Sequence, residues 1–368
     1  MTTPSLRSRI LLVDLLKAVA AQFIVLHHLA WYGPLSDQAA TLAPWVATVD
    51  VWLAEYGRYA VAVFITTGGF LAAQTLSFRG LAPGTHPLCL IHDRYFRLVL
   101  PFMVALLMAI AASTLARQWM THDSIGSPPT LMQFLAHLGL LHGLLGIESL
   151  SAGVWYVAID FQLYALLVLL LWLGGCRPTS AEFSRALLIV ILAVGSLFYF
   201  NRAAQWDATG LYFFGAYALG VGAGWAIRTP WHARLLWLIV LIAGAALWFE
   251  FRPRIALALA TALVLGCTRL HMTHLEMKYL HYFGGTSYAL FLVHFPVCLV
   301  INAAFQRFAP ADPGYAAWGV LVAWLASNLV ADLFHRHVEL PLARWQKRRI
   351  ICKAGQKPAI PKSSFKPT

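Results

Sequence analysis

Long apolar blocks separated by short polar segments run along nearly the whole chain. From this pattern we expect membrane-spanning helices at about residues 10–31, 59–78, 98–116, 153–174, 186–201, 208–227, 234–250, 255–268, 285–305 and 315–335. Most of these blocks are long enough to cross a bilayer as a helix. A segment in lipid must satisfy its own backbone hydrogen bonds. The pattern therefore predicts an all-α transmembrane bundle of about ten spans.

The segment 131–146 (LMQFLAHLGLLHGLLG) is the ambiguous part of this pattern. It is short for a span and contains His137, His142 and three glycines, so it could also lie at the membrane interface. If it does not cross and the N-terminus is inside, twenty Lys and Arg lie inside and six outside, with Lys17 inside a span. The positive-inside rule then favours ten spans with both termini in the cytoplasm.

The composition agrees with a multi-pass membrane protein. The chain has 368 residues, 60% of them hydrophobic and 11% charged, less than half of the roughly 25% usual in soluble domains. The net charge of +12 fits cytoplasmic loops and anionic headgroups, because no RNA-binding pattern of aromatic and basic residues is visible. We expect the lipid bilayer as a partner and no nucleic acid. Residues 1–343 form the predicted membrane domain, and the basic segment 344–368 is predicted to be a disordered cytoplasmic tail.

The residue pattern does not favour a disulfide framework, a metal site or a cleavable signal peptide. The five cysteines are odd in number and show no CxxC spacing, which argues against a disulfide framework and a metal site. The first apolar segment contains Asp14 and Lys17 and lacks a following small-x-small site, so we do not expect a cleavable signal peptide.

Polar residues within the predicted spans are the first candidates for chemistry. The stretch DLLKAVAAQFIVLHHL (14–29) places Lys17 and His28 eleven residues apart, on one helix face and about 16 Å from each other. Asp14 lies on nearly the same face. Such residues are costly in lipid and point to function. The simpler alternative is a snorkelling Lys17 paired with Asp14, and a histidine at the interface.

Two further stretches combine a structural and a functional interpretation. In HDRYFRLVLP (92–101), Arg94 and Arg97 lie one helical turn apart at the start of a span, where they anchor the topology or bind a polyanion such as phosphate. In TTGGFLAAQTL (66–76), Gly68 and Gly69 either allow close helix packing or let a ligand approach the backbone.

Three more stretches carry polar residues near or inside later spans. VWYVAIDFQLY (154–164) contains an acid well inside a span that needs a partner, whereas its aromatic pair is typical of an interface belt. The others are GGTSYALFLVHFPV (284–297) and HRHVELPLARW (335–345). The candidate residues of the three stretches are Trp155, Tyr156, Asp160, Gln162, Ser287, Tyr288, His294 and Glu339.

Taken together and in this order, these stretches resemble the acyltransferase 3 family of bacterial integral membrane acyltransferases. The resemblance runs from about residue 9 to 345. It rests on Lys17 with His28 eleven residues later, Gly68-Gly69-Phe70-Leu71, Arg94 and Arg97 before Pro101, Trp155 through Asp160 to Tyr164, Thr286-Ser287-Tyr288 through His294 to Val297, and Glu339-Leu340-Pro341-Leu342. The chain departs from the family pattern in having Asp160 in place of glutamate and no serine before Gly69.

The resemblance implies an enzyme of the inner, cytoplasmic membrane of bacteria. It moves an acyl group, commonly acetyl from acetyl-CoA, to a sugar hydroxyl of an extracytoplasmic glycan, and it holds no permanent cofactor. Lys17, Arg94 and Arg97 are then suited to the phosphates of coenzyme A. His28, selected over His27 by the spacing to Lys17, is the candidate general base, or is itself acylated.

The same resemblance suggests supporting roles for other residues. Asp160 is expected to orient His28, as a carboxylate orients a catalytic imidazole. Ser287, Tyr288 or His294 is expected to polarise the acyl carbonyl.

Other functions stay open at this point. A transporter could use the intramembrane His, Asp and Lys residues as a proton or substrate relay, although no pair of interrupted helices marks inverted repeats. A di-haem membrane protein is disfavoured, because the histidines form no matched pairs on two facing helices. The acceptor, the acyl chain, and whether a separate periplasmic partner completes the transfer are not specified by the sequence.

Overall fold

Helices form the regular structure in the described part of the chain, which confirms the all-α class. The computed structural model describes residues 4–77, 79–81, 85–175, 181–268 and 274–355. Its α-helices are α1 (Pro4–Trp31), α2 (Pro34–Ala40), α3 (Pro44–Tyr56), α4 (Val61–Thr75), α5 (Pro87–Trp119), α6 (Leu131–Leu138), α7 (Val154–Leu173), α8 (Ala181–Phe198), α9 (Gly210–Ala226), α10 (His232–Phe249), α11 (Pro253–Cys267), α12 (His274–Phe308), α13 (Pro313–Phe334) and α14 (Leu340–Gly355). The turn η1 (Gly57–Ala60) joins α3 to α4, and the π-helix η5 (His335–Glu339) joins α13 to α14.

Seven helical segments among the described residues are long and apolar enough to cross a membrane. They are Ile10–Trp31, Pro87–Trp119, Val154–Leu173, Ala181–Arg202, His232–Phe249, Tyr279–Phe308 and Pro313–Arg349. The other three expected spans correspond to α4, α9 and α11, which are helices of 15, 17 and 15 residues. At 1.5 Å per residue these reach about 22 to 26 Å, somewhat short of the roughly 30 Å hydrocarbon core. The number ten therefore stays a prediction.

The ambiguous segment enters the bundle and returns to the same end. Its helix α6 has only 8 residues, too few to cross. The segment runs beside α5, where Tyr95 Oη donates to the carbonyl of Leu138 at 2.7 Å. It then turns back, because the amide of Leu150 donates to His137 Nε2 at 3.2 Å. Gln133, near the start of the segment, and Leu150, four residues beyond its end, line one cavity, so the chain leaves the segment close to where it entered.

Glycines allow α4 and α9 to pack in direct backbone contact. A Cβ on Gly69 would collide with the carbonyl oxygen of Tyr217, and a Cβ on Gly220 with that of Thr66. Small residues at such a crossing bring helix backbones close together in membranes. Of the two interpretations of Gly69, the packing role is therefore the one that the structure supports.

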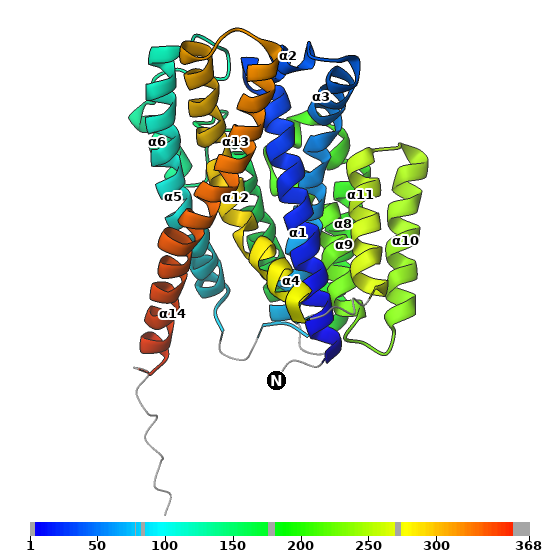
Figure 1. Cartoon of the computed structure of the whole chain (residues 1–368). Coiled ribbons are helices and arrows are strands. Elements are labelled where there is room, and N and C mark those ends of the chain that lie inside the picture. Colours follow the sequence, from blue (N-terminus) through cyan, green and yellow to red (C-terminus); the bar gives the residue numbers. More distant parts are fainter. Residues whose placement is uncertain (1–3, 78, 82–84, 176–180, 269–273, 356–368) are drawn as a thin grey trace, which may run out of the picture.

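Both ends of the described chain lie at one end of the bundle. Figure 1 shows the start of α1 and the projecting helix α14 at this end, and α2 and α3 at the opposite end. The helix α14 continues to Gly355, so part of the segment expected to be disordered is helical. The rest of that segment, residues 356–368, lies outside the described residues.

Candidate active site

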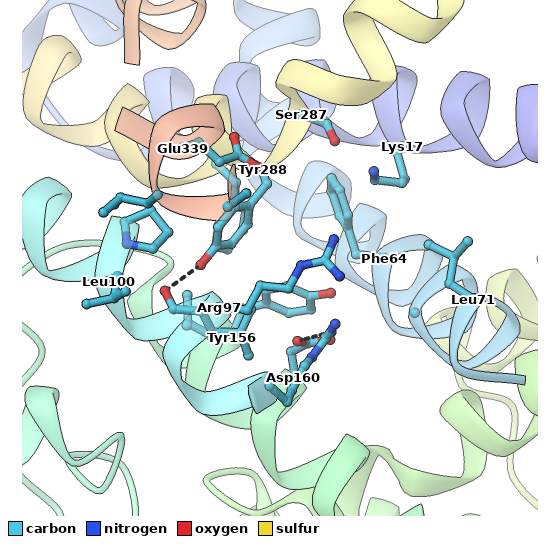
Figure 2. Close-up of a pocket in the computed structure, with 18 of the residues that line it drawn as sticks. Lys17, Phe64, Leu71, Arg97, Leu100, Tyr156, Asp160, Ser287, Tyr288 and Glu339 are labelled. Atoms are coloured by element: carbon cyan, nitrogen blue, oxygen red, sulfur yellow. Dashed lines mark hydrogen bonds and ion pairs between the residues drawn. The ribbon is translucent and has the colours of Figure 1, made fainter. Parts of the chain in front are cut away.

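A cavity of about 320 Å³ opens among α1, α4, α5, α7, α12 and α14 (Figure 2). We call it the basic cavity. It brings together residues that are far apart in the sequence, and its charged lining residues are Lys17, Arg94, Arg97, Asp160 and Glu339. Three cations against two carboxylates leave the cavity with an excess of positive charge. Four of the six sequence stretches singled out above supply these five residues.

Asp160 is paired with Arg94 inside the basic cavity. Arg94 Nη2 donates to Asp160 Oδ2 at 2.6 Å, and the guanidinium also lies over the ring of Tyr164 (5.2 Å to the centroid). The Asp160 side chain is only 9% exposed, so a partner of opposite charge is needed there. The expected hydrogen bond from Asp160 to His28 is therefore replaced by an ion pair with Arg94, and the Arg94 guanidinium is already engaged.

Lys17 and Asp14 both bind α12, but not each other. Lys17 Nζ donates to the carbonyl of Gly284 at 3.1 Å, and His281 Nδ1 donates to Asp14 Oδ2 at 3.1 Å. Gly284 allows α1 and α12 to approach this closely, because a Cβ at this position would collide with Asp14. The predicted face of α1 thus docks on α12, and only Lys17 of this pair reaches the basic cavity.

Arg97 is the cation that points into the basic cavity with its guanidinium uncommitted. Figure 2 shows it extending between Tyr156 and Phe64. Within the described part of the chain its guanidinium has no hydrogen-bond partner. An arginine presented in this way is suited to an anionic ligand, which it can bind with two parallel hydrogen bonds.

The other candidates near the basic cavity make structural hydrogen bonds. Ser287 Oγ donates to the carbonyl of Gly284 at 2.7 Å, and Tyr288 Oη donates to the carbonyl of Leu98 at 3.1 Å. Glu339, at the end of the π-helix, accepts from His335 Nδ1 at 2.8 Å and faces the cavity. Gly68 lines the cavity, whereas Gly69 does not.

Three aromatic rings close the inner end of the basic cavity. Phe291 lies 5.0 Å from Tyr156 and 6.0 Å from Phe64, measured between ring centroids, and all three line the cavity. On its other side Phe291 lies 6.3 Å from the ring of His294. The aromatic rings therefore separate the basic cavity from the histidines.

His28 and His294 form a buried pair behind these rings. His28 Nδ1 lies 2.5 Å from His294 Nε2, and the two rings are parallel within 3°. His294 Nδ1 lies 2.9 Å from the carbonyl of Leu290, to which it must donate, because a carbonyl only accepts. In a neutral pair His294 Nε2 is therefore an acceptor and His28 Nδ1 the donor. This leaves the lone pair of His28 on Nε2, where it can accept a proton.

His27 faces a different helix. Its Nδ1 donates to the carbonyl of Leu53 on α3 at 3.1 Å, and η1 packs against it, since a Cβ on Gly57 would lie 2.7 Å from the His27 Cβ. The two adjacent histidines thus have different environments. His28, which shares a helix face with Lys17, is the one that is bonded to another titratable side chain.

A second cavity, of about 250 Å³, lies on the other side of the histidine pair. We call it the outer cavity. Tyr32 and Phe295 line it, and Tyr32 lies edge-on to His28 with 5.4 Å between ring centroids. Two sequence candidates remain. Trp155 stacks on Phe213 and lines a neighbouring cavity at this end, whereas Gln162 Oε1 accepts from the amide of Gly210 at 2.7 Å. The histidine pair therefore sits between two cavities that open toward opposite ends of the bundle.

Tyr32, Phe64 and Phe291 were not among the residues predicted from the sequence, whereas Tyr156 was. Tyr32 follows His28 by four residues, and residues at this spacing share a helix face, so its position was recoverable. Phe64 and Phe291 carry no such sign, because they look like ordinary core residues. Among the described residues no group of three or more His, Cys, Asp and Glu side chains is arranged to hold a metal ion.

Comparison with known protein families shows a match over most of the chain. The family model described as an acyltransferase domain matches residues 10–328, which include the basic cavity up to α12 and both histidines of the pair. No curated protein and no solved structure matches the chain.

Proposed function

The chain belongs to the acyltransferase 3 family, whose members are membrane acyltransferases, and we propose that it moves an acyl group from cytoplasmic acyl-CoA to a saccharide hydroxyl outside the membrane. The acyl group we expect is acetyl. The observation that carries the proposal is the His28–His294 pair, which lies between the basic cavity and the outer cavity. A base in this position has access to a donor from one side and an acceptor from the other.

The proposal orients the bundle with the basic cavity facing the cytoplasm of a bacterial inner membrane. The exposed residues Arg344, Lys347, Arg348 and Arg349 of α14 lie at the same end as this cavity. Basic residues collect on the cytoplasmic side. With α4, α9 and α11 included as spans, the chain crosses ten times and both termini are cytoplasmic. The short length of these three helices is accommodated by their packing inside the bundle.

The basic cavity suits the donor because coenzyme A carries several phosphate charges. Arg97 and Lys17 supply positive charge that can meet them, whereas Arg94 holds Asp160 in place. Lys17 and His28 are about 16 Å apart along α1. An extended pantetheine arm can bridge such a distance, with its thioester at the aromatic rings. The ring of Phe291 then has to move aside before the acyl group reaches His28.

The chemical step follows from the tautomer of the histidine pair. His28 Nε2 takes the proton of the acceptor hydroxyl while the hydroxyl oxygen forms a bond to the acyl carbon. The carbon–sulfur bond of the thioester breaks, and the coenzyme A thiolate leaves. The proton on His28 then passes to the thiolate, so that the products are the saccharide ester and free coenzyme A. Because each cavity is one aromatic side chain away from the pair, the proposal does not require a separate transfer partner once these rings move aside.

The test is mass spectrometry of envelope glycans from a strain that lacks the gene, complemented with wild type, His28→Ala or His27→Ala. We expect a mass of one acyl group that disappears on deletion and returns with wild type and His27→Ala, but not with His28→Ala. His27→Ala is the matched control because it removes the neighbouring imidazole, whose hydrogen bond is structural. Membrane levels of each protein are compared by immunoblotting.

Two other outcomes would contradict parts of the proposal. Full restoration by His28→Ala would rule out His28 as the base. An unchanged glycan profile in every strain would rule out an envelope saccharide as the acceptor.

A further inference from the structure

The outer cavity has a polar lining that contains carboxylates and hydroxyls but no Lys or Arg. Asp123 and Glu148 line it, together with several serines. The side chain of Arg117 is at the rim, where it donates to the carbonyl of Gly126 at 2.7 Å. Carboxylates and hydroxyls bind sugar hydroxyls well, but they disfavour a ligand that itself carries an acid group.

The outer cavity lies beside the proposed base, with the ring of Tyr32 between them. The Tyr32 ring lies 5.4 Å from the His28 ring and 5.3 Å from Phe295, and both Tyr32 and Phe295 line the cavity. A ligand in this cavity therefore lies one aromatic side chain away from His28. The basic cavity is separated from the pair in the same way by Phe291.

Ser151 provides an unpaired polar atom in this cavity. The residue is 5% exposed, and its Oγ has no hydrogen-bond partner in the part of the chain that the structure describes. A buried hydroxyl without a partner costs free energy and is usually explained by a ligand or water. Ser151 lines the outer cavity, so a ligand bound there can satisfy it.

A neighbouring cavity of about 340 Å³ shares Ser149 with the outer cavity and contains a second such group. His142 is 1% exposed and lines this cavity, and neither of its ring nitrogens has a partner among the described residues. Burial, followed by the nearby His137, lowers the pKa of His142 to about 4. The imidazole is therefore neutral near pH 7 and offers one donor and one acceptor. Trp155 supplies an aromatic surface in the same cavity.

We propose that these adjoining cavities form the acceptor groove, with a sugar that bears no acid group in the outer cavity and the next sugar of the same chain beside His142 and Trp155. This inference rests on the proposed function and specifies its acceptor. The acceptor is then a saccharide of at least two units rather than a small alcohol. The reacting hydroxyl comes from the unit beside Tyr32.

The test uses the full-length protein in lipid nanodiscs, with acetyl-CoA as donor and envelope saccharide from a strain lacking the gene as acceptor. We expect Ser151→Ala and His142→Phe each to raise the KM for saccharide about 2- to 12-fold, as the loss of one hydrogen bond does. The KM for acetyl-CoA stays unchanged, which also checks folding. Glu55→Gln is the control, because Glu55 is exposed on α3 and lines neither cavity.

A further variant tests the charge of the outer cavity. With an acidic oligogalacturonide as competitor, Glu148→Gln is expected to lower the inhibition constant several-fold, because it removes a repelling carboxylate. Glu148 is exposed, so this variant is expected to fold. Glu55→Gln is again the control and leaves the inhibition constant unchanged.

The position of the acyl group on the product, determined by mass spectrometry, completes the test. An acyl group on a sugar with a carboxylate or phosphate would overturn the inference, and so would wild-type KM values for saccharide in both Ser151→Ala and His142→Phe. In either case the proposed function stands, because transfer still occurs. Absence of any transfer by the wild type would instead overturn the proposed function, and the inference with it.

Discussion

Replacement of His294 by leucine tests the tautomer on which the proposed reaction depends. In the structure His294 Nδ1 donates to the Leu290 carbonyl, which leaves Nε2 to accept from His28 Nδ1 at 2.5 Å. Leucine removes this acceptor and keeps the size of the side chain similar. The proton of His28 is then no longer held on Nδ1, and the imidazole can carry it on Nε2, the nitrogen that has to act as the base.

The size of the effect follows from burial. Both histidines are buried, so the Nδ1–H group of His28 loses its partner without access to solvent. A buried donor without a partner costs about 1–3 kcal/mol. If the reactive tautomer is disfavoured by this amount, kcat falls about 5- to 150-fold, since about 1.4 kcal/mol corresponds to a factor of ten. The KM for acyl-CoA stays near the wild-type value, because the basic cavity is unchanged.

The assay is steady-state acyl transfer by the protein in nanodiscs, with kcat and KM for acyl-CoA measured separately. His294→Gln is the matched control. Its side-chain oxygen restores an acceptor, so kcat recovers in part. A His294→Leu protein with wild-type kcat and unchanged thermal unfolding would refute the reasoning, because His28 would then not need His294 to define its tautomer.

Three further predictions concern the donor side and the bundle. Arg97→Gln is expected to raise the KM for acyl-CoA about 10- to 150-fold at unchanged kcat, since a hydrogen bond to a charged group is worth about 1.5–3 kcal/mol. An unchanged KM would exclude contact between Arg97 and the donor. Asp160→Ala is expected to destabilise the protein by about 3–5 kcal/mol, because it leaves the charge of Arg94 without its partner. The double variant Asp160→Ala with Arg94→Met is expected to recover most of the lost stability, and thermal unfolding in detergent measures both variants. Gly69→Ala is expected to lower the unfolding temperature because its Cβ collides with α9, whereas Gly244→Ala, with no atom within 4 Å of the added Cβ, does not.

The long apolar helices of the fold were predictable from the sequence because lipid imposes a simple constraint, whereas the short helices α2 and α3 were not predicted. Each apolar block has to be a helix. The all-α class therefore followed from hydropathy. Charge only favoured a path in which 131–146 does not cross, and the length of α6, 8 residues, supports that path. The path of that segment did not follow, because its return depends on Tyr95 and His137 bonding to Leu138 and Leu150. Those contacts join parts of the chain whose proximity is fixed only by tertiary packing.

In the candidate site, the spacing of residues along one helix was predictable from the sequence, but their pairing between helices was not. Spacing along one helix placed Lys17 and His28 on one face of α1. In the structure Lys17 lines the basic cavity and His28 is bonded to His294. Pairing between helices could not be read in this way, and Asp160 was matched with the wrong partner. An acid within a span needs a counter-charge, but the sequence offers Lys17, Arg94, Arg97 and the histidines alike.

The depth of Asp160 in the bundle explains why it pairs with Arg94 rather than with a histidine. Asp160 lies six residues into α7, which places it about 9 Å below the start of that helix. Arg94 meets it there with a permanent charge, whereas an imidazole would neutralise it only when protonated. His28 is consequently left to pair with another imidazole, and two neutral imidazoles that share one hydrogen bond need no counter-charge in the core of the bundle. Asp160 therefore pairs with Arg94, which balances its charge, and His294 pairs with His28.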